Sequence, residues 1–115
     1  MEVTMAYVSL TLINVRSFWS LPKFYWHAMR TRKAAMLASG NLQVSTKAFG
    51  VFTHGTMTLW VSRQAMIGYV RGMVHLEAMR AFDQIGTGAV YGYDAAQLPS
   101  WEEASHLLAE HGRDV

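Results

Sequence analysis

The chain has 115 residues, a formal net charge of +2 at neutral pH and no cysteine. This length suits a single domain over residues 1–115, and the lack of cysteine excludes a disulfide framework, a zinc-thiolate site and a cysteine nucleophile, which favours a cytoplasmic protein. No apolar run reaches the ~18 residues that a membrane span requires, so no membrane span is predicted. Basic residues cluster only at 30–33, which is typical of a solvated helix face and not of a nucleic-acid interface.

The first half of the chain predicts a strand, a helix and two further strands. Residues 3–13 are rich in β-branched residues and apolar at both parities, which indicates a strand covered on both faces. A helix is predicted over 21–38, because a proline suits its first turn and apolar residues recur at helical spacing until Gly40. Residues 42–49 and 56–61 are predicted to be two neighbouring antiparallel strands.

A second helix and a further strand are predicted after these strands. Ser62 is a suitable N-cap, and the apolar stripe of the helix that follows would bury charged residues unless the helix breaks near Gly72. We therefore expect a bend there, which turns a second apolar stripe inward before Gly86 ends the helix. Residues 89–94, within the glycine-flanked stretch 86–94, are predicted to be the last strand.

The chain closes with a terminal helix. Ser100 and Glu103 form a capping box, in which each side chain bonds to the backbone N–H of the other residue, and Gly112 ends the helix. The complete order predicts an α+β, ferredoxin-like βαββαβ domain with an appended C-terminal helix and a four-stranded antiparallel sheet.

A sheet of this kind has helices on one face only. Because both parities of its strands are largely apolar, we expect a homodimer in which two sheets pack face to face. The alternative is that the terminal helix covers the second face of its own sheet.

Several short motifs follow this order along residues 21–104. They are Leu59-Trp60, the spacing Tyr69-x5-His75 followed by Met79, and Leu98-Pro99-Ser100-Trp101-Glu102-Glu103-Ala104 after the strand. The first helix, with Arg32 and the turn Ser39-Gly40-Asn41, fits the same pattern. Together these motifs resemble the dimeric α/β barrel superfamily, and within it the small proteins similar to spheroidene monooxygenase.

The resemblance implies more about fold than about reaction. The superfamily includes antibiotic biosynthesis monooxygenases, which oxidise aromatic substrates without a metal, together with haem-using members and many proteins of unknown function. Spheroidene monooxygenases are longer, and no residue here matches a haem ligand of that family. We therefore expect no cofactor, with haem as the alternative.

Arg32 is a candidate catalytic residue because it lies within an apolar stripe of the first predicted helix. The other residues of the stripe are Leu21, Tyr25, Met29 and Met36. A guanidinium in the helix-sheet cavity would hold a carboxylate or phenolate, or stabilise an oxyanion. Alternatively, Arg32 snorkels at the rim or pairs with an acid such as Glu77 or Asp83.

His75 and Tyr69 are the candidates for proton transfer. The stripe that includes His75 also contains Ala78, Met79 and Phe82, so burial would keep its imidazole neutral, as a general base or a haem ligand requires. The alternative is a core histidine bonded to a backbone carbonyl. No two histidines stand at i and i+4, so no metal site is predicted.

Aromatic and methionine side chains are the candidates for lining a pocket, since aromatic rings stack and methionine adapts to irregular ligands. The candidate pocket residues are Met29, Trp60, Met66, Met73, Met79 and Tyr91. The leading hypothesis is a small monooxygenase-like enzyme that acts on a hydrophobic aromatic or polyene substrate. The alternatives are a non-catalytic binding module for a small apolar ligand or haem, and a structural or interaction domain without a ligand.

Overall fold

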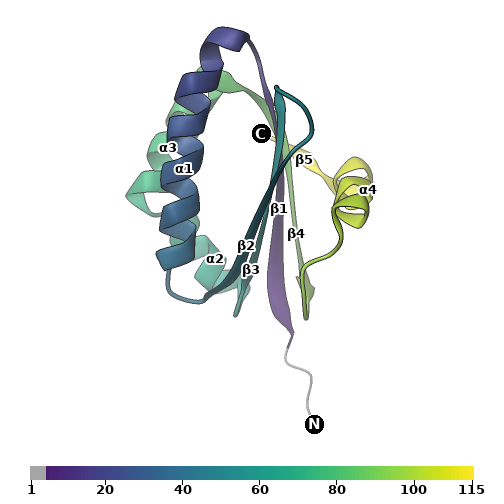
Figure 1. Cartoon of the computed structure of the whole chain (residues 1–115). Coiled ribbons are helices and arrows are strands. Elements are labelled where there is room, and N and C mark those ends of the chain that lie inside the picture. Colours follow the sequence, from purple (N-terminus) through teal and green to yellow (C-terminus); the bar gives the residue numbers. More distant parts are fainter. Residues whose placement is uncertain (1–4) are drawn as a thin grey trace.

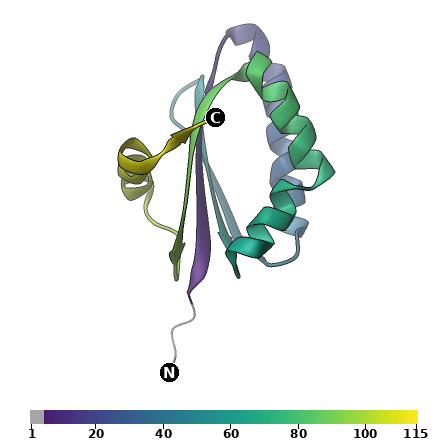
Figure 2. The ribbon, with the colours of Figure 1, turned by 180° about the vertical axis from the view of Figure 1, so that it is seen from behind.

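The computed structural model describes residues 5–115 and every side chain among them except that of Asp83. The elements, in chain order, are β1 (Ala6–Val15), η1 (Phe18–Ser20), α1 (Leu21–Leu37), β2 (Asn41–Ala48), β3 (Thr53–Trp60), α2 (Arg63–Val70), α3 (Met73–Ile85), β4 (Gly86–Ala95), α4 (Trp101–His111) and β5 (Arg113–Asp114). The sheet forms the central layer, with α1, α2 and α3 on one side and α4 on the other (Figures 1 and 2).

The strand order is β2-β3-β1-β4-β5, and every neighbouring pair is antiparallel. The first four strands have the ferredoxin-like arrangement, which confirms the predicted fold class. The predicted strand number is wrong, because β5 pairs with Ala89 and Val90 and makes a five-stranded sheet. Two residues at a chain end are too short to show an alternating pattern in the sequence.

The predicted helix break is confirmed, and two strand boundaries are corrected. α2 ends at Val70 and α3 begins at Met73, while Gly72 between them is extended, with φ −68° and ψ 153°. β1 continues to Val15, two residues beyond its predicted end, and its predicted start at residues 3 and 4 lies outside the described residues. β3 begins at Thr53, three residues before its predicted start.

The packing face of α1 differs from the predicted one. The helix buries Leu21, Phe24 and Ala35, whereas the expected core residues Tyr25 and Met29 are 46% and 73% exposed. At about 100° per residue, the buried stripe is rotated by roughly a quarter turn from the predicted stripe. The sequence permitted both faces, because α1 has apolar residues on two sides.

α4 covers the second face of the sheet. This is the arrangement that the sequence analysis gave as the alternative to a homodimer. Ala104 and Leu108 of α4 pack against the fully buried Val8 and Leu10 of β1. Gly55 of β3 allows a close approach, since a Cβ there would lie 2.7 Å from the ring of Trp101. The apolar side chains that suggested a second subunit therefore have a cover within the same chain.

The start of α4 confirms the predicted N-cap and corrects one half of the capping box. The backbone N–H of Glu103 donates to Ser100 Oγ at 3.1 Å. The Glu103 carboxylate accepts from the Ser100 hydroxyl at 3.5 Å, and not from its backbone N–H. Gly112 is the C-cap, as predicted. Over residues 5–115, no helix is both long enough and apolar enough to cross a bilayer.

Candidate functional site

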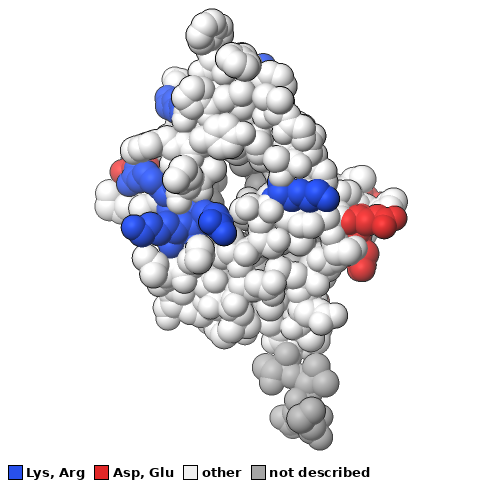
Figure 3. Space-filling view, in the orientation of Figure 1, with Lys and Arg blue, Asp and Glu red and all other residues white. Residues whose placement is uncertain are grey.

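The core between the helical layer and the sheet is divided into two clusters. One cluster is centred on Val15, Leu21, Phe24 and Ile85, and the other on Tyr7, Ala35 and Trp60. The space-filling view shows an opening between the helical layer and the sheet (Figure 3). The two clusters therefore support the helical layer at its ends and leave its middle open.

The sheet presents hydroxyl groups between these clusters. Side chains alternate along β1, so Ser9 and Thr11 lie on the same face as buried Tyr7, and they pair with Thr58 and Thr56 of β3. Within the described residues, the hydroxyls of Ser9, Thr11 and Thr56 make no side-chain hydrogen bond, whereas Thr58 Oγ1 accepts from Trp60 Nε1 at 2.8 Å. We call Ser9, Thr11, Thr56 and Thr58 the hydroxyl band.

The sequence interpretation did not identify the hydroxyl band as part of a site. The available signal is the spacing of two between Ser9 and Thr11 and between Thr56 and Thr58. Neither pair is informative alone, because the antiparallel register of β1 and β3 is needed to place them side by side.

Trp60, Tyr69 and His75 form an aromatic cluster at one end of the hydroxyl band. The rings of Trp60 and Tyr69 stack with centroids 5.3 Å apart, and the ring of His75 meets that of Tyr69 edge-on at 5.1 Å. Through the hydrogen bond from Trp60 to Thr58, this cluster is continuous with the hydroxyl band. The structure therefore brings together three of the predicted site residues, from β3, α2 and α3.

Tyr69 is a hydrogen-bond donor in this cluster. Its hydroxyl donates to the backbone carbonyl of Thr31 in α1 at 3.0 Å. Burial raises the pKa of Tyr69 to about 12, although its contact with Thr31 acts in the opposite direction. The phenol therefore stays protonated at neutral pH, which makes Tyr69 unsuitable as a general base.

His75 has the properties of a proton acceptor. Burial lowers the pKa of His75 from its ordinary value of 6.5, and the Val70 carbonyl opposes this shift. Nδ1 of His75 is buried and makes no hydrogen bond of acceptable geometry. The imidazole is therefore neutral at physiological pH, with the Val70 carbonyl as its polar neighbour.

A second histidine lies at the opposite end of the hydroxyl band. His54, which lies between the two predicted strands, belongs to β3; its ring is tilted against that of Phe24 at 4.7 Å and meets that of Tyr25 edge-on at 5.4 Å. Its Nε2 is 2.9 Å from the Val51 carbonyl oxygen. This hydrogen bond orients the ring beside Phe24 and Tyr25.

Arg32 is not buried with this cluster. Its side chain is exposed on α1, as the rim alternative predicted, while His75 is half-buried beside α2. Glu77 pairs with Arg30 at 2.8 Å, and not with Arg32. The other acid considered for Arg32, Asp83, has its side chain outside the described part of the structure.

Only two of the predicted pocket residues lie at the site. Trp60 is fully buried, and Met66 packs against its cluster. The remaining four are corrected: Met29, Met73 and Met79 are 73%, 76% and 51% exposed, and Tyr91 lies on the α4 side of the sheet, stacked on Tyr93. The exposed methionines belong to a second apolar surface, which hydrophobic periodicity does not distinguish from a buried one.

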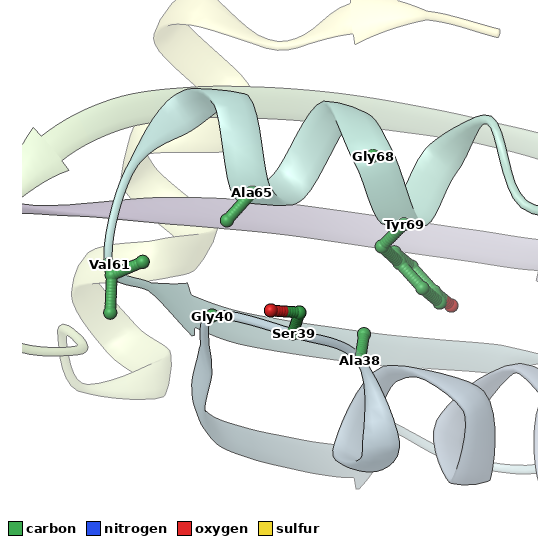
Figure 4. A pocket seen from close by; sticks show the side chains of 7 residues that line it. All are labelled: Ala38, Ser39, Gly40, Val61, Ala65, Gly68 and Tyr69. Atoms are coloured by element: carbon green, nitrogen blue, oxygen red, sulfur yellow. The ribbon is translucent and has the colours of Figure 1, made fainter.

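A shallow pocket of about 380 Å³ adjoins the aromatic cluster. It lies where the end of α1 meets α2, and Tyr69 forms one wall (Figure 4). Its other lining residues are small or apolar: Ala38, Ser39, Gly40, Val61, Ala65 and Gly68. A pocket of similar size, about 360 Å³, lies on the other side of the molecule beside β4 and β5. Within the described residues, no three His, Asp or Glu side chains are placed to hold a metal ion.

No model of a known protein family matches the chain, and no curated protein has a significantly similar sequence. Solved structures are similar to it in fold. A protein of unknown function from Nitrosomonas europaea is 13% identical, with a TM-score of 0.69 over 86% of this chain and 99% of that chain. SnoaB, a cofactor-independent oxygenase from Streptomyces nogalater, is 12% identical, with a TM-score of 0.67 over 83% of this chain and 97% of that chain.

A third similar structure is a candidate antibiotic biosynthesis monooxygenase from Deinococcus radiodurans. It is 12% identical, with a TM-score of 0.71 over 82% of this chain and 96% of that chain. At this level of identity the likeness establishes the fold alone. It confirms, at the level of fold alone, the similarity that the sequence motifs predicted.

Proposed function

We propose that the chain is a monooxygenase-like enzyme that acts on an oxygenated aromatic substrate without a cofactor. The substrate would lie between the helical layer and the sheet. The observation that carries this proposal is the half-buried imidazole of His75, which burial holds in its neutral form, in an aromatic cluster that is continuous with the hydroxyl band. The fold shared with a cofactor-independent oxygenase is compatible with this function.

The site favours an aromatic substrate over a polyene. Tyr69, which lines the adjoining pocket and is backed by the buried ring of Trp60, offers an aromatic side chain to a substrate, and Met66 beside them adapts to ligand shape. A pure hydrocarbon would leave the hydroxyls of Ser9 and Thr11 without partners, and burying an unpaired hydroxyl is costly. A ring that carries hydroxyl or carbonyl groups would satisfy them.

Neutral His75 would remove a proton from such a substrate. The resulting carbanion or phenolate is electron-rich and transfers its electrons to O₂, which is the oxidant. When a benzylic CH₂ is oxidised to a carbonyl, one oxygen atom enters the product and the other leaves as water, so CH₂ and O₂ give C=O and H₂O. This balance requires no external reductant, and the proton taken by His75 is returned to the departing water.

Oxygen uptake with a hydroxyanthrone as the probe substrate tests the proposal. We expect turnover by the purified chain, and a fall in kcat of about 100-fold or more in His75→Gln, which removes the proton acceptor. Tyr69→Phe should retain kcat within about threefold, because the phenol transfers no proton in this scheme. His106→Gln, an exposed histidine of α4, is the matched control. No uptake by the wild type, or equal uptake by His75→Gln, would contradict the proposed enzyme.

A non-catalytic binding module is the second candidate, because the pocket of about 380 Å³ beside Tyr69 is apolar and needs no reaction to be useful. In that case the same probe would quench the fluorescence of buried Trp60 but would not consume O₂. Titration with haem, followed by absorbance, tests whether the ligand of such a module is haem. In that case the wild type would show a Soret band, and the band would be absent in His75→Ala.

We further propose that the chain forms a homodimer through the α4 side of the sheet. Apolar side chains remain exposed in the turn between β2 and β3, where Phe49, Val51 and Phe52 are 39%, 56% and 41% exposed. The ring of Phe49 contacts Trp101 of α4 at 5.6 Å, so this turn borders the α4 side. A second copy of the chain would cover these apolar side chains, which α4 leaves exposed.

A further inference from the structure

α1 has a second apolar face that points away from the core. Leu21, Phe24 and Ala35 are buried against the sheet. On the other side of the helix, Trp26, Met29, Met36 and Leu37 are 55%, 73%, 56% and 77% exposed. A helix that is apolar on two sides normally has a cover on both.

α3 extends this exposed surface. Met73, Leu76 and Met79 are 76%, 37% and 51% exposed, on the side of α3 opposite buried Ile85. The two helices are neighbours, linked by the ion pair between Arg30 and Glu77. We call the set Trp26, Met29, Met36, Leu37, Met73, Leu76 and Met79 the outer helical face.

The charges beside the outer helical face are predominantly basic. α1 carries Lys23, Arg30, Arg32 and Lys33 and no Asp or Glu. α3 carries Arg80 with Glu77 and Asp83, so the two helices together are net positive. α4 carries Glu102, Glu103 and Glu110 and no Lys or Arg. In Figure 3 most of the visible basic side chains lie over the helical layer, where one acidic patch is also visible, and the larger acidic group lies at α4.

We propose that the outer helical face docks onto the surface of an anionic lipid bilayer. The two helices would lie parallel to the membrane, with the tryptophan and methionine side chains at the level of the headgroups and acyl chains. Lys23, Arg32 and Lys33 would contact the lipid phosphates and carboxylates. The acidic α4 lies on the far side of the sheet and would face away from the membrane (Figure 1).

The composition of the face favours a bilayer over a protein partner. Tryptophan at a membrane interface has its ring in the apolar layer and its N–H in water, and Trp26 lies among lysine and arginine side chains that reach lipid headgroups. Arg30 lies over the ring of Trp26, with its guanidinium carbon 4.6 Å from the ring centroid. Trp19, just before α1, is 88% exposed and would add a second interfacial anchor.

Co-sedimentation with vesicles tests this proposal. The probes are vesicles of pure phosphatidylcholine and vesicles in which about a third of the lipid is phosphatidylserine. We expect binding to the anionic vesicles at low salt, at least tenfold weaker binding to the neutral ones, and weakening as salt is raised. Brominated lipids in the anionic vesicles should quench tryptophan fluorescence, and less so in Trp26→Ser.

Surface variants separate the contributions of charge and apolar area. Arg32→Gln with Lys33→Gln should reduce binding to anionic vesicles about tenfold or more, and Trp26→Ser with Leu37→Ser by a similar factor. Arg113→Gln and Val115→Ser, exposed residues at the other end of the chain, are the matched controls. Because all of these side chains are exposed, circular dichroism should show unchanged folding.

Two results would overturn the proposal. One is the absence of binding to anionic vesicles at low salt, or equal binding by the wild type and both double variants. The other is a self-associated species in light scattering that Trp26→Ser with Leu37→Ser dissociates, without vesicle binding, which would assign the face to a second copy of the chain.

Discussion

At the scale of single residues, the chemistry of His75 depends on what surrounds its ring. Its Nδ1 is buried without a hydrogen bond, and its nearest aromatic neighbour, Tyr69, directs its own hydroxyl to the Thr31 carbonyl. Tyr69 therefore packs its ring against His75, while its hydroxyl proton is directed to Thr31 and not to the imidazole. This division of roles makes His75 the proton acceptor of the proposed reaction.

The lowered pKa of His75 predicts a loss of stability in acid. In the folded chain the neutral imidazole is favoured, so below about pH 6.5 the unfolded state binds the proton more readily. The free energy of unfolding should therefore fall as pH drops from the unfolded pKa to the lower folded pKa, and His75 should have no effect above that range. His27 acts in the same direction, because burial and then the charges of Lys23 and Arg30 lower its pKa.

Urea unfolding near pH 7.5 and near pH 5 measures this effect. The difference in the free energy of unfolding between the two pH values should be smaller in His75→Gln than in the wild type. His106→Gln, which removes an exposed histidine, should leave the difference unchanged. An unchanged difference in His75→Gln would show that its ring does not resist protonation in the fold.

At the scale of elements, the junction between α1 and α2 decides the shape of the pocket beside Tyr69. Gly40 has a φ of +86°, and a Cβ there would lie 2.6 Å from Cβ of Ala65 in α2. Gly50, in the turn between β2 and β3, also has a positive φ, of +108°, but it faces open space. Both glycines therefore have a positive φ, but only Gly40 is packed against a neighbouring side chain.

Replacing each of these glycines with alanine separates strain from packing. We expect Gly50→Ala to lower the free energy of unfolding by about 1–2 kcal/mol, through the left-handed backbone alone. Gly40→Ala should cost at least about 1 kcal/mol more, because α2 must also move away. Denaturant titration of both variants checks this order, and equal costs would mean that the contact between Gly40 and Ala65 is easily relieved.

At the scale of the whole molecule, the two faces of the sheet differ in how they are covered. On one side α1, α2 and α3 rest on two separate clusters and leave an opening over the hydroxyl band. On the other side α4 packs closely, through Ala104 and Leu108. The opening is where a substrate is proposed to bind, and the α4 side is where a second copy is proposed to pack.

Light scattering at micromolar concentration tests the dimer. We expect a mass of twice the 12.9 kDa of one chain. Val51→Ser with Phe52→Ser, at the exposed turn between β2 and β3, should shift the mass to that of one chain. Trp26→Ser with Leu37→Ser should leave the dimer intact, because those residues lie on the opposite side. A wild-type monomer at this concentration would contradict the dimer and leave α4 as the complete cover.

Much of the fold was predictable, and less of the site. The break at Gly72 and the cap at Ser100 follow from local backbone and hydrogen-bond requirements, so the sequence indicates them directly. Trp60, Tyr69 and His75 were also expected at a site, and they do lie together. The predicted orientations of Met29 and Met79 are wrong, because an apolar stripe gives no sign of whether its partner is the core or another surface.

The sequence by itself determined the order of helices and strands, the bend in the second helical segment and the ferredoxin-like class. These features depend on properties of a few neighbouring residues, such as the backbone freedom of a glycine, the hydrogen bond of a serine N-cap, or the alternation of side chains along a strand. Only the tertiary structure decided which face of α1 packs inward, that α4 covers the second face of the sheet, and that Ser9 and Thr11 lie beside Thr56 and Thr58. Those features depend on contacts between residues far apart in the chain, and no local pattern encodes such contacts.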